Sequence, residues 1–117
     1  MEVDWSKCKG GIWCMLNNID LDHKNLRNVE GVYIIWAEPE EGRLIIKVGK
    51  GDISDELKEA RVEHAVQAFT NYTLFATWAE VSSLRRAGVE LYLSKTLNPK
   101  IASNAKAAFA TEVNLPW

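Results

Sequence analysis

The clearest pattern in the chain is a pair of short apolar runs near its middle. Residues 31–36 (GVYIIW) and residues 43–48 (RLIIKV) are rich in β-branched and aromatic side chains, which favour strands. The acidic segment 38–41 lies between them, and Pro39 and Gly42 are typical turn residues. Two strands joined by so short a connection predict an antiparallel hairpin.

An amphipathic helix is predicted after this hairpin, running from about residue 54 to residue 69. Ser54, or alternatively Asp52, is a suitable N-cap, and Asp55 and Glu56 then fall in the first turn, where the helix dipole favours negative charge. The apolar positions recur at helical spacing. They are Leu57, Val62, Ala65, Val66 and Phe69.

A third strand and a second helix complete the predicted core. Residues 73–81 alternate between two sets of side chains in the period of a strand. Ser82 or Ser83 can cap the following helix, which should end near Leu97 because Asn98 and Pro99 cannot continue it. The predicted order is therefore β-β-α-β-α, and the expected fold is a small α/β sandwich with a three-stranded, mostly antiparallel sheet flanked by helices.

The length of 117 residues suits one domain, so residues 1–117 are expected to fold as a single unit. Residues 1–28 are read as an irregular N-terminal arm, in which 12–16 forms either a short strand or a packed segment. Residues 29–104 form the core, and 105–117 form a tail whose leucine, proline and tryptophan indicate that it packs against the core.

Cysteine usage and charge bear on compartment and partners. Cys8 and Cys14 do not have the spacing of a zinc site and are expected to be reduced thiols of a cytoplasmic protein. Neither a signal peptide nor an apolar run of membrane-spanning length is visible, so no membrane association is expected. The net charge of −2 argues against general affinity for nucleic acid, although a local basic patch can still bind it.

The order of motifs resembles the GIY-YIG nuclease superfamily. Gly31-Val32-Tyr33 stands at the position of the GIY triplet, and Lys47-Val48-Gly49 at that of YIG. Residues 49–53 resemble the link into the first helix, Glu90 matches the glutamate of the second helix, and 97–100 resembles the segment after it. A single triplet is a weak signal, but the ordered set is more specific and covers about residues 28–104, most of the chain.

The resemblance implies a divalent-metal-dependent endonuclease that hydrolyses phosphodiester bonds in DNA. Tyr33 would act as the general base or assist it, and Glu90 would hold one Mg²⁺ or Mn²⁺ ion. Gly49 and either Lys50 or Lys47 would contact phosphate. A fixed cation lowers the barrier where negative charge develops on phosphate oxygens, so a metal ion and a lysine near the phosphate suit the reaction. The mechanism requires Tyr33 and Glu90 to face each other across one groove that can hold the cation.

Two positions depart from the family pattern. Lys47 replaces the tyrosine of the second motif, and Glu56 stands where the first helix should carry an arginine. Arg61 is the nearest arginine along that helix, but it lies about 140° around from Glu56. It can substitute only if its side chain curls back, and His64 is the candidate polar helper. Each of these residues also fits an ordinary structural or solvent-exposed role.

Two functions therefore remain open. One is a metal-dependent endonuclease whose catalysis is weakened or lost by these substitutions. The alternative is a non-catalytic binding module for nucleic acid or for a basic protein partner, which would meet an acidic helix stripe made by Glu56, Glu59 and Glu63. Carboxylates on one stripe can also form a new metal site, but more often they only face solvent.

Overall fold

Four antiparallel strands form one sheet in the order β1-β4-β2-β3. The computed structural model describes all residues from 1 to 117. The strands are β1 (Cys14–Met15), β2 (Glu30–Ala37), β3 (Leu44–Asp52) and β4 (Phe75–Glu80), and the helices are α1 (Ile53–Val62), α2 (His64–Gln67) and α3 (Ser83–Leu97). Three 3-10 turns, Lys9–Gly11, Leu16–Asn18 and Lys24–Leu26, lie in the N-terminal arm.

The prediction of a three-stranded sheet is wrong by one short strand. The additional strand, β1, comes from the N-terminal arm and pairs Cys14 with Ala76 and Met15 with Phe75. The sequence left a short strand or a packed segment open for residues 12–16, because so few residues carry little periodicity, and β1 forms there because β4 offers it a free edge. The class, a compact α/β fold with an antiparallel sheet, is confirmed.

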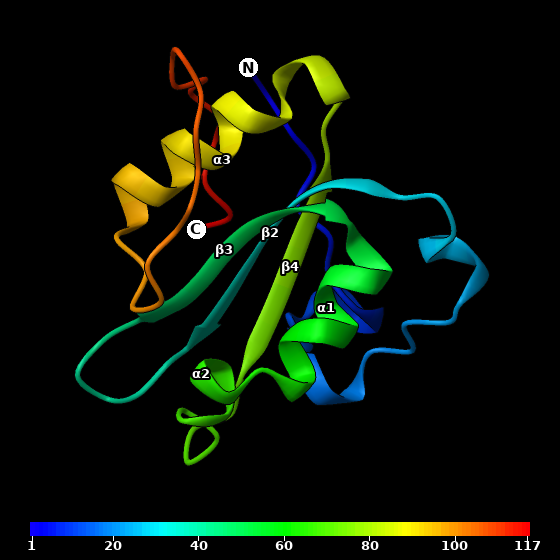
Figure 1. The fold of residues 1–117 in the computed structure, drawn as a ribbon. Helices are drawn as coiled ribbons and strands as arrows, with labels where there is room; N and C mark the ends of the chain where they lie inside the picture. Colours follow the sequence, from blue (N-terminus) through cyan, green and yellow to red (C-terminus); the bar gives the residue numbers. More distant parts are fainter.

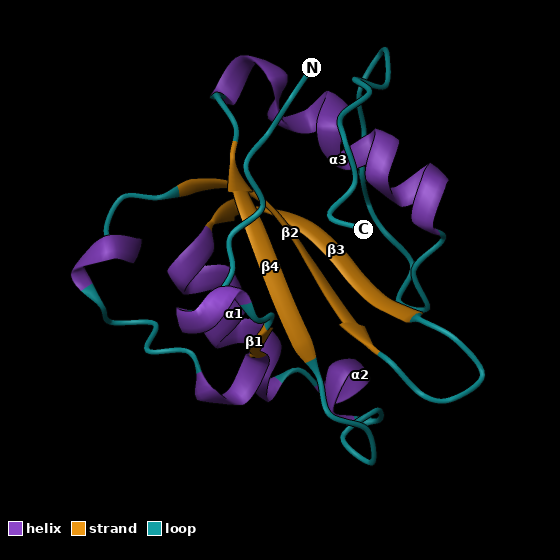
Figure 2. Cartoon of the chain, turned by 180° about the vertical axis from the view of Figure 1, so that it is seen from behind, coloured by secondary structure: helices purple, strands orange, loops and turns teal.

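The central strand β2 is buried along almost its whole length, from Gly31 to Ala37. Its alternating side chains divide the interior into two cores. Figures 1 and 2 show α1 and α3 on the two sides of the sheet. Tyr33, Ile35 and Ala37 pack with α1, and Val32, Ile34 and Trp36 pack with α3. The two longer helices therefore cover opposite faces of the sheet.

The helix predicted over residues 54–69 is interrupted in the structure. α1 ends at Val62, Glu63 has extended backbone angles (φ −73°, ψ 125°), and the short α2 follows. The side chain of Glu63 binds Lys47 on β3, a tertiary contact that the helical periodicity cannot reveal. At the other end, Asp52 is the N-cap and accepts a hydrogen bond from the amide of Asp55, so one of the two predicted caps is confirmed.

The second helix ends as predicted, and the C-terminal tail packs beside it (Figure 2). α3 begins after its N-cap Ser82 and ends at Leu97, where Asn98 takes a left-handed conformation (φ 49°). Further on, the amide of Thr111 donates to the carbonyl of Gly88 in α3. Asn114 exchanges two hydrogen bonds with the backbone of Val3, which ties the two chain ends together.

Aromatic side chains from distant segments gather around Trp36 in the core on the α3 side. Trp13 and Trp117 meet its ring edge to face, at centroid distances of 5.4 and 5.1 Å, and Phe75 lies 5.7 Å away. Such pairs add to the stabilisation that comes from burial. The N-terminal arm and the tail thereby share one packing site with the sheet.

The expectation of two reduced thiols is wrong, because Cys8 and Cys14 form a disulfide. The two residues are only six apart, and the pair Gly10-Gly11 allows the chain to turn back between them. Disulfides are rare in the cytosol. The cysteines therefore no longer support the cytoplasmic location inferred from them. None of the helices has the length and apolarity needed to cross a bilayer.

Gly88 is expected to be essential for the contact between α3 and the tail. A Cβ atom there would lie 2.3 Å from Oγ1 of Thr111 and 3.0 Å from the carbonyl oxygen of Phe109. Alanine normally stabilises a helix by about 1 kcal/mol relative to glycine. Here Gly88→Ala should instead lower the free energy of unfolding by about 1–3 kcal/mol through overpacking, as measured by urea denaturation.

The double variant Gly88→Ala/Thr111→Ala should recover part of this loss, because it removes the closest atom. A Gly88→Ala protein more stable than wild type would contradict the packing described between α3 and the tail.

Candidate functional site

Tyr33 reaches the edge of the sheet across a glycine. It lies opposite Gly49 of β3, and a Cβ atom on Gly49 would come within 2.4 Å of the phenol oxygen. Only glycine therefore leaves room for this ring. The phenol then donates a hydrogen bond of 3.2 Å to the carboxylate of Glu56 on α1.

The surroundings of Tyr33 keep its proton in place. Burial raises the pKa of the phenol well above its usual range, and the carboxylate of Glu56 raises it further. The charges of Glu63 and Glu90 act in the same direction. At neutral pH the phenol is thus a hydrogen-bond donor, and it is unsuited to remove a proton from an attacking water.

The two lysines predicted to meet phosphate are both held by carboxylates of this chain. Lys47 forms an ion pair of 2.5 Å with Glu63, and Lys50 forms one of 2.9 Å with Glu90. Glu90 is largely buried, with its side chain 9% exposed, whereas that of Lys50 is 39% exposed. A phosphate group could bind either lysine only by displacing its partner or by approaching alongside a negative charge.

Tyr33 and Glu90 do not face each other across one groove. Tyr33 packs in the core on the α1 side, whereas Glu90 lies on α3 and pairs with Lys50, which points to the opposite face of β3 from Gly49. The two groups are close enough for the charge of Glu90 to raise the pKa of both Tyr33 and Glu56. They form one electrostatic group around the edge of β3, but each side chain lies on its own face of the sheet.

We call this group the β3-edge cluster. Its members are Tyr33, Lys47, Gly49, Lys50, Glu56, Glu59, Glu63 and Glu90. Four carboxylates face two ammonium groups, so the β3-edge cluster has an excess of negative charge. The sequence placed the first four and Glu90 at a site and put Glu56 at the position of the family's helix arginine, and it treated Glu59 and Glu63 only as parts of a helix stripe. Glu63 pairs with Lys47 at the break between α1 and α2, and nothing in the sequence predicted this break.

The β3-edge cluster does not fit the Mg²⁺ or Mn²⁺ ion that the resemblance implies. The carboxylate of Glu90 is occupied by the ammonium group of Lys50. Nowhere in the chain do three or more His, Cys, Asp or Glu side chains converge as metal ligands would. Hard divalent cations bind through carboxylate and other oxygen ligands. The carboxylate proposed for this role, that of Glu90, already neutralises Lys50.

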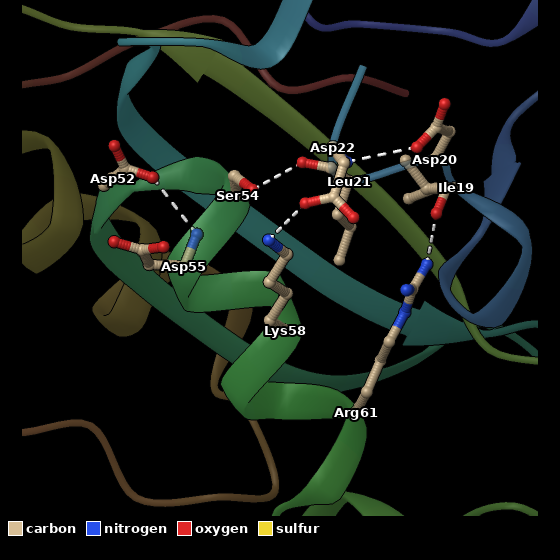
Figure 3. A network of polar contacts seen from close by, with 9 residues as sticks. All are labelled: Ile19, Asp20, Leu21, Asp22, Asp52, Ser54, Asp55, Lys58 and Arg61. Carbon is tan, nitrogen blue, oxygen red and sulfur yellow. Dashed lines mark hydrogen bonds and ion pairs between the residues drawn. The ribbon is translucent and has the colours of Figure 1, made fainter.

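Arg61 lies outside the β3-edge cluster and has a structural role instead (Figure 3). Its guanidinium group donates to the carbonyl oxygens of Leu16, at 2.7 and 2.9 Å, and of Ile19. On the same side of α1, Ser54 binds the carbonyl of Leu21, and further contacts secure this part of the N-terminal arm. The suggestion that Arg61 replaces the missing arginine is therefore a misassignment, because the side chain points toward the arm.

His64 also fails to join the predicted site. It is an exposed residue at the start of α2 and forms no hydrogen bond or ion pair with the side chains of the β3-edge cluster. The helix break at Glu63 moves it off the continuous helix on which the prediction placed it.

Comparison with protein families, with curated proteins and with solved structures found no match for this chain.

Glu56→Gln is expected to stabilise the protein at neutral pH. Burial, opposed by the hydrogen bond from Tyr33, raises the pKa of Glu56 above its ordinary value of 4.5, so folding disfavours the ionised carboxylate. Glutamine remains neutral and can still accept from Tyr33. Urea denaturation at pH 7 should therefore give the variant a higher unfolding midpoint than wild type.

This advantage should shrink as the pH falls below the ordinary carboxyl range, because Glu56 is then neutral in both the folded and unfolded states. Glu41→Gln, at an exposed position in the β2–β3 turn, is the matched control and should show no such difference. A difference that stays constant across this pH range would show that the ionisation of Glu56 is not its cause.

Arg61→Ala should lower the free energy of unfolding by about 1.5–3 kcal/mol, because buried carbonyl groups of the arm lose a charged donor. Chemical denaturation measures this loss. Lys58→Ala is the control on the same helix. Its ion pair with Asp22 is solvent-exposed, so its loss should matter much less. Equal effects of the two substitutions would argue against the structural role of Arg61.

Proposed function

We propose that this domain is a non-catalytic binding module that recognises a basic segment of a partner protein through the β3-edge cluster. The proposal rests above all on the contact between Tyr33 and Glu56. At the place where the resemblance expects an arginine to attract phosphate, the chain has a carboxylate that holds the phenolic proton. Membership of the GIY-YIG superfamily stays a prediction. An active nuclease of that superfamily is the competing function.

Electrostatics argue against phosphodiester hydrolysis at this cluster. A phosphate would meet the excess carboxylates of Glu56 and Glu59, while Lys47 and Lys50 are already neutralised. Loss of a single charge-stabilising donor commonly reduces catalysis by a factor of about 100 to 1,000. Here the missing arginine and the protonated state of Tyr33 act together, so weak or lost catalysis is expected.

The same charges favour a basic protein partner. Glu59 is exposed and forms no ion pair within the chain, and Asp55 lies exposed one turn earlier on α1. An arginine- or lysine-rich segment could pair with these groups without breaking the internal ion pairs. Charge complementarity of this kind chiefly affects specificity and the rate of association. DNA is the other partner considered from the sequence. The β3-edge cluster offers it no comparable feature, because both lysines of the cluster are already paired with glutamates.

Titration with a fluorescent arginine-rich peptide tests the proposal. Wild type should bind it in the micromolar range, with affinity that falls as salt is added. Glu59→Gln should weaken binding several-fold. The control, Glu41→Gln, also removes one exposed carboxylate but lies in the β2–β3 turn, so it should leave the affinity unchanged. Equal losses in the two variants would indicate attraction to net charge alone and would contradict a site on α1.

A cleavage assay on supercoiled plasmid with Mg²⁺ or Mn²⁺ tests the competing nuclease function. We expect no nicking above background by wild type. Cleavage by wild type that Glu90→Ala abolishes would overturn the non-catalytic interpretation and restore the endonuclease.

A further inference from the structure

The disulfide between Cys8 and Cys14 closes a loop that projects from the edge of the sheet. Cys14 belongs to β1, is 2% exposed and pairs with Ala76 of β4. Just before the loop, Ser6 is also fixed to β4: its amide donates to the carbonyl of Trp78, and its carbonyl accepts from the hydroxyl of Thr77. Residues 8–13 are thus an excursion between two points that are anchored independently of the disulfide.

The two cysteines differ in accessibility and adjoin a cavity. Cys8 is exposed, whereas Cys14 is buried. Both line a cavity of about 580 Å³, which is also bounded by Lys7, Lys9 and the ring of Trp78. This space can admit a small thiol. The ammonium groups of Lys7 and Lys9 outnumber the single carboxylate of Asp20 around it, so its charge favours a negatively charged thiol. Positive charge near a sulfur also stabilises the thiolate involved in exchange.

We propose that Cys8–Cys14 is a reversible redox site that reacts with a small anionic thiol through the exposed sulfur of Cys8. The thiolate attacks Sγ of Cys8 and forms a mixed disulfide, while the bond to Cys14 breaks and its sulfur leaves as a thiolate that takes a proton from solvent. A second thiol then attacks the mixed disulfide and frees Cys8. Two small thiols are oxidised to one disulfide, and the protein disulfide is reduced to two thiols.

Reduction should release the loop without unfolding the domain. A disulfide that closes a short loop restricts the unfolded chain less than one that closes a long loop, and this pair is six residues apart. The anchors at Ser6 and Cys14 also remain after reduction. The released segment includes Trp13, whose edge-to-face contact with Trp36 then loses its covalent support. The inference does not depend on the function proposed for the β3-edge cluster.

The single-cysteine variants Cys14→Ser and Cys8→Ser test which sulfur reacts. Each folded variant is incubated with oxidised glutathione, and mass spectrometry follows the mixed disulfide. The Cys14→Ser protein, which retains Cys8, should react at least about tenfold faster than the Cys8→Ser protein, because access controls the rate of exchange. Equal rates, or faster reaction of Cys14, would overturn the assignment of Cys8 as the reactive sulfur.

Treatment of wild type with excess reduced glutathione tests whether the bond is a switch. We expect two free thiols, faster amide hydrogen exchange in residues 8–13 and unchanged exchange in β2 and β3. If the bond resists reduction, or if exchange accelerates throughout the sheet because the domain unfolds, the disulfide is a structural staple and the proposal fails. A cooperative thermal unfolding transition of the reduced protein provides an independent check that the domain stays folded.

Discussion

The burial of β2 on both faces is the constraint on which the rest of this fold depends. A strand with hydrogen-bonded neighbours on both sides and apolar side chains on both faces must be covered by two separate layers. α1 and residues 14–26 of the N-terminal arm cover one face. α3, the C-terminal tail and the first part of the arm, with Val3, Trp5 and Trp13, cover the other. Successive side chains of β3 point to opposite faces of the sheet, so each polar group on this strand meets either the α1 layer or the α3 layer.

This division explains why the motif residues do not assemble as a hydrolytic centre. Tyr33 and Lys47 meet partners that come from α1 and the residue after it, while Lys50 meets Glu90 from α3. Charges partly removed from water need partners of opposite sign, and these pairs provide them at short range. The arrangement lowers the cost of burying Glu90, and it also removes the free positive charge that a phosphate would need.

The N-terminal arm is more closely integrated than its irregular sequence indicates. Arg61 holds the carbonyl of Ile19 (Figure 3) and that of Leu16. β1 extends the sheet beside β4. At the opposite face, Asn114 joins Val3 to the tail. These contacts link residues far apart in the chain, so no local pattern predicts them. The same holds for the disulfide, because the spacing of two cysteines does not show whether their side chains face each other.

Local chemistry was sufficient to predict the hairpin, the third strand and the end of α3 at Asn98, and it reduced the cap of α1 to Ser54 or Asp52. Each of these follows from periodicity or from the conformational preferences of a few neighbouring residues. The sequence also singled out Tyr33, Lys47, Lys50 and Glu90 as candidate site residues, and all four form polar contacts near β3. Only the tertiary structure decided their partners and the face on which each lies. The tertiary structure also decided the helix break at Glu63 and the direction of the Arg61 side chain toward the N-terminal arm. The physical reason is that ion pairs and hydrogen bonds between distant segments depend on how the layers pack, and side chains as long as lysine, arginine and glutamate can reach several alternative partners from one backbone position.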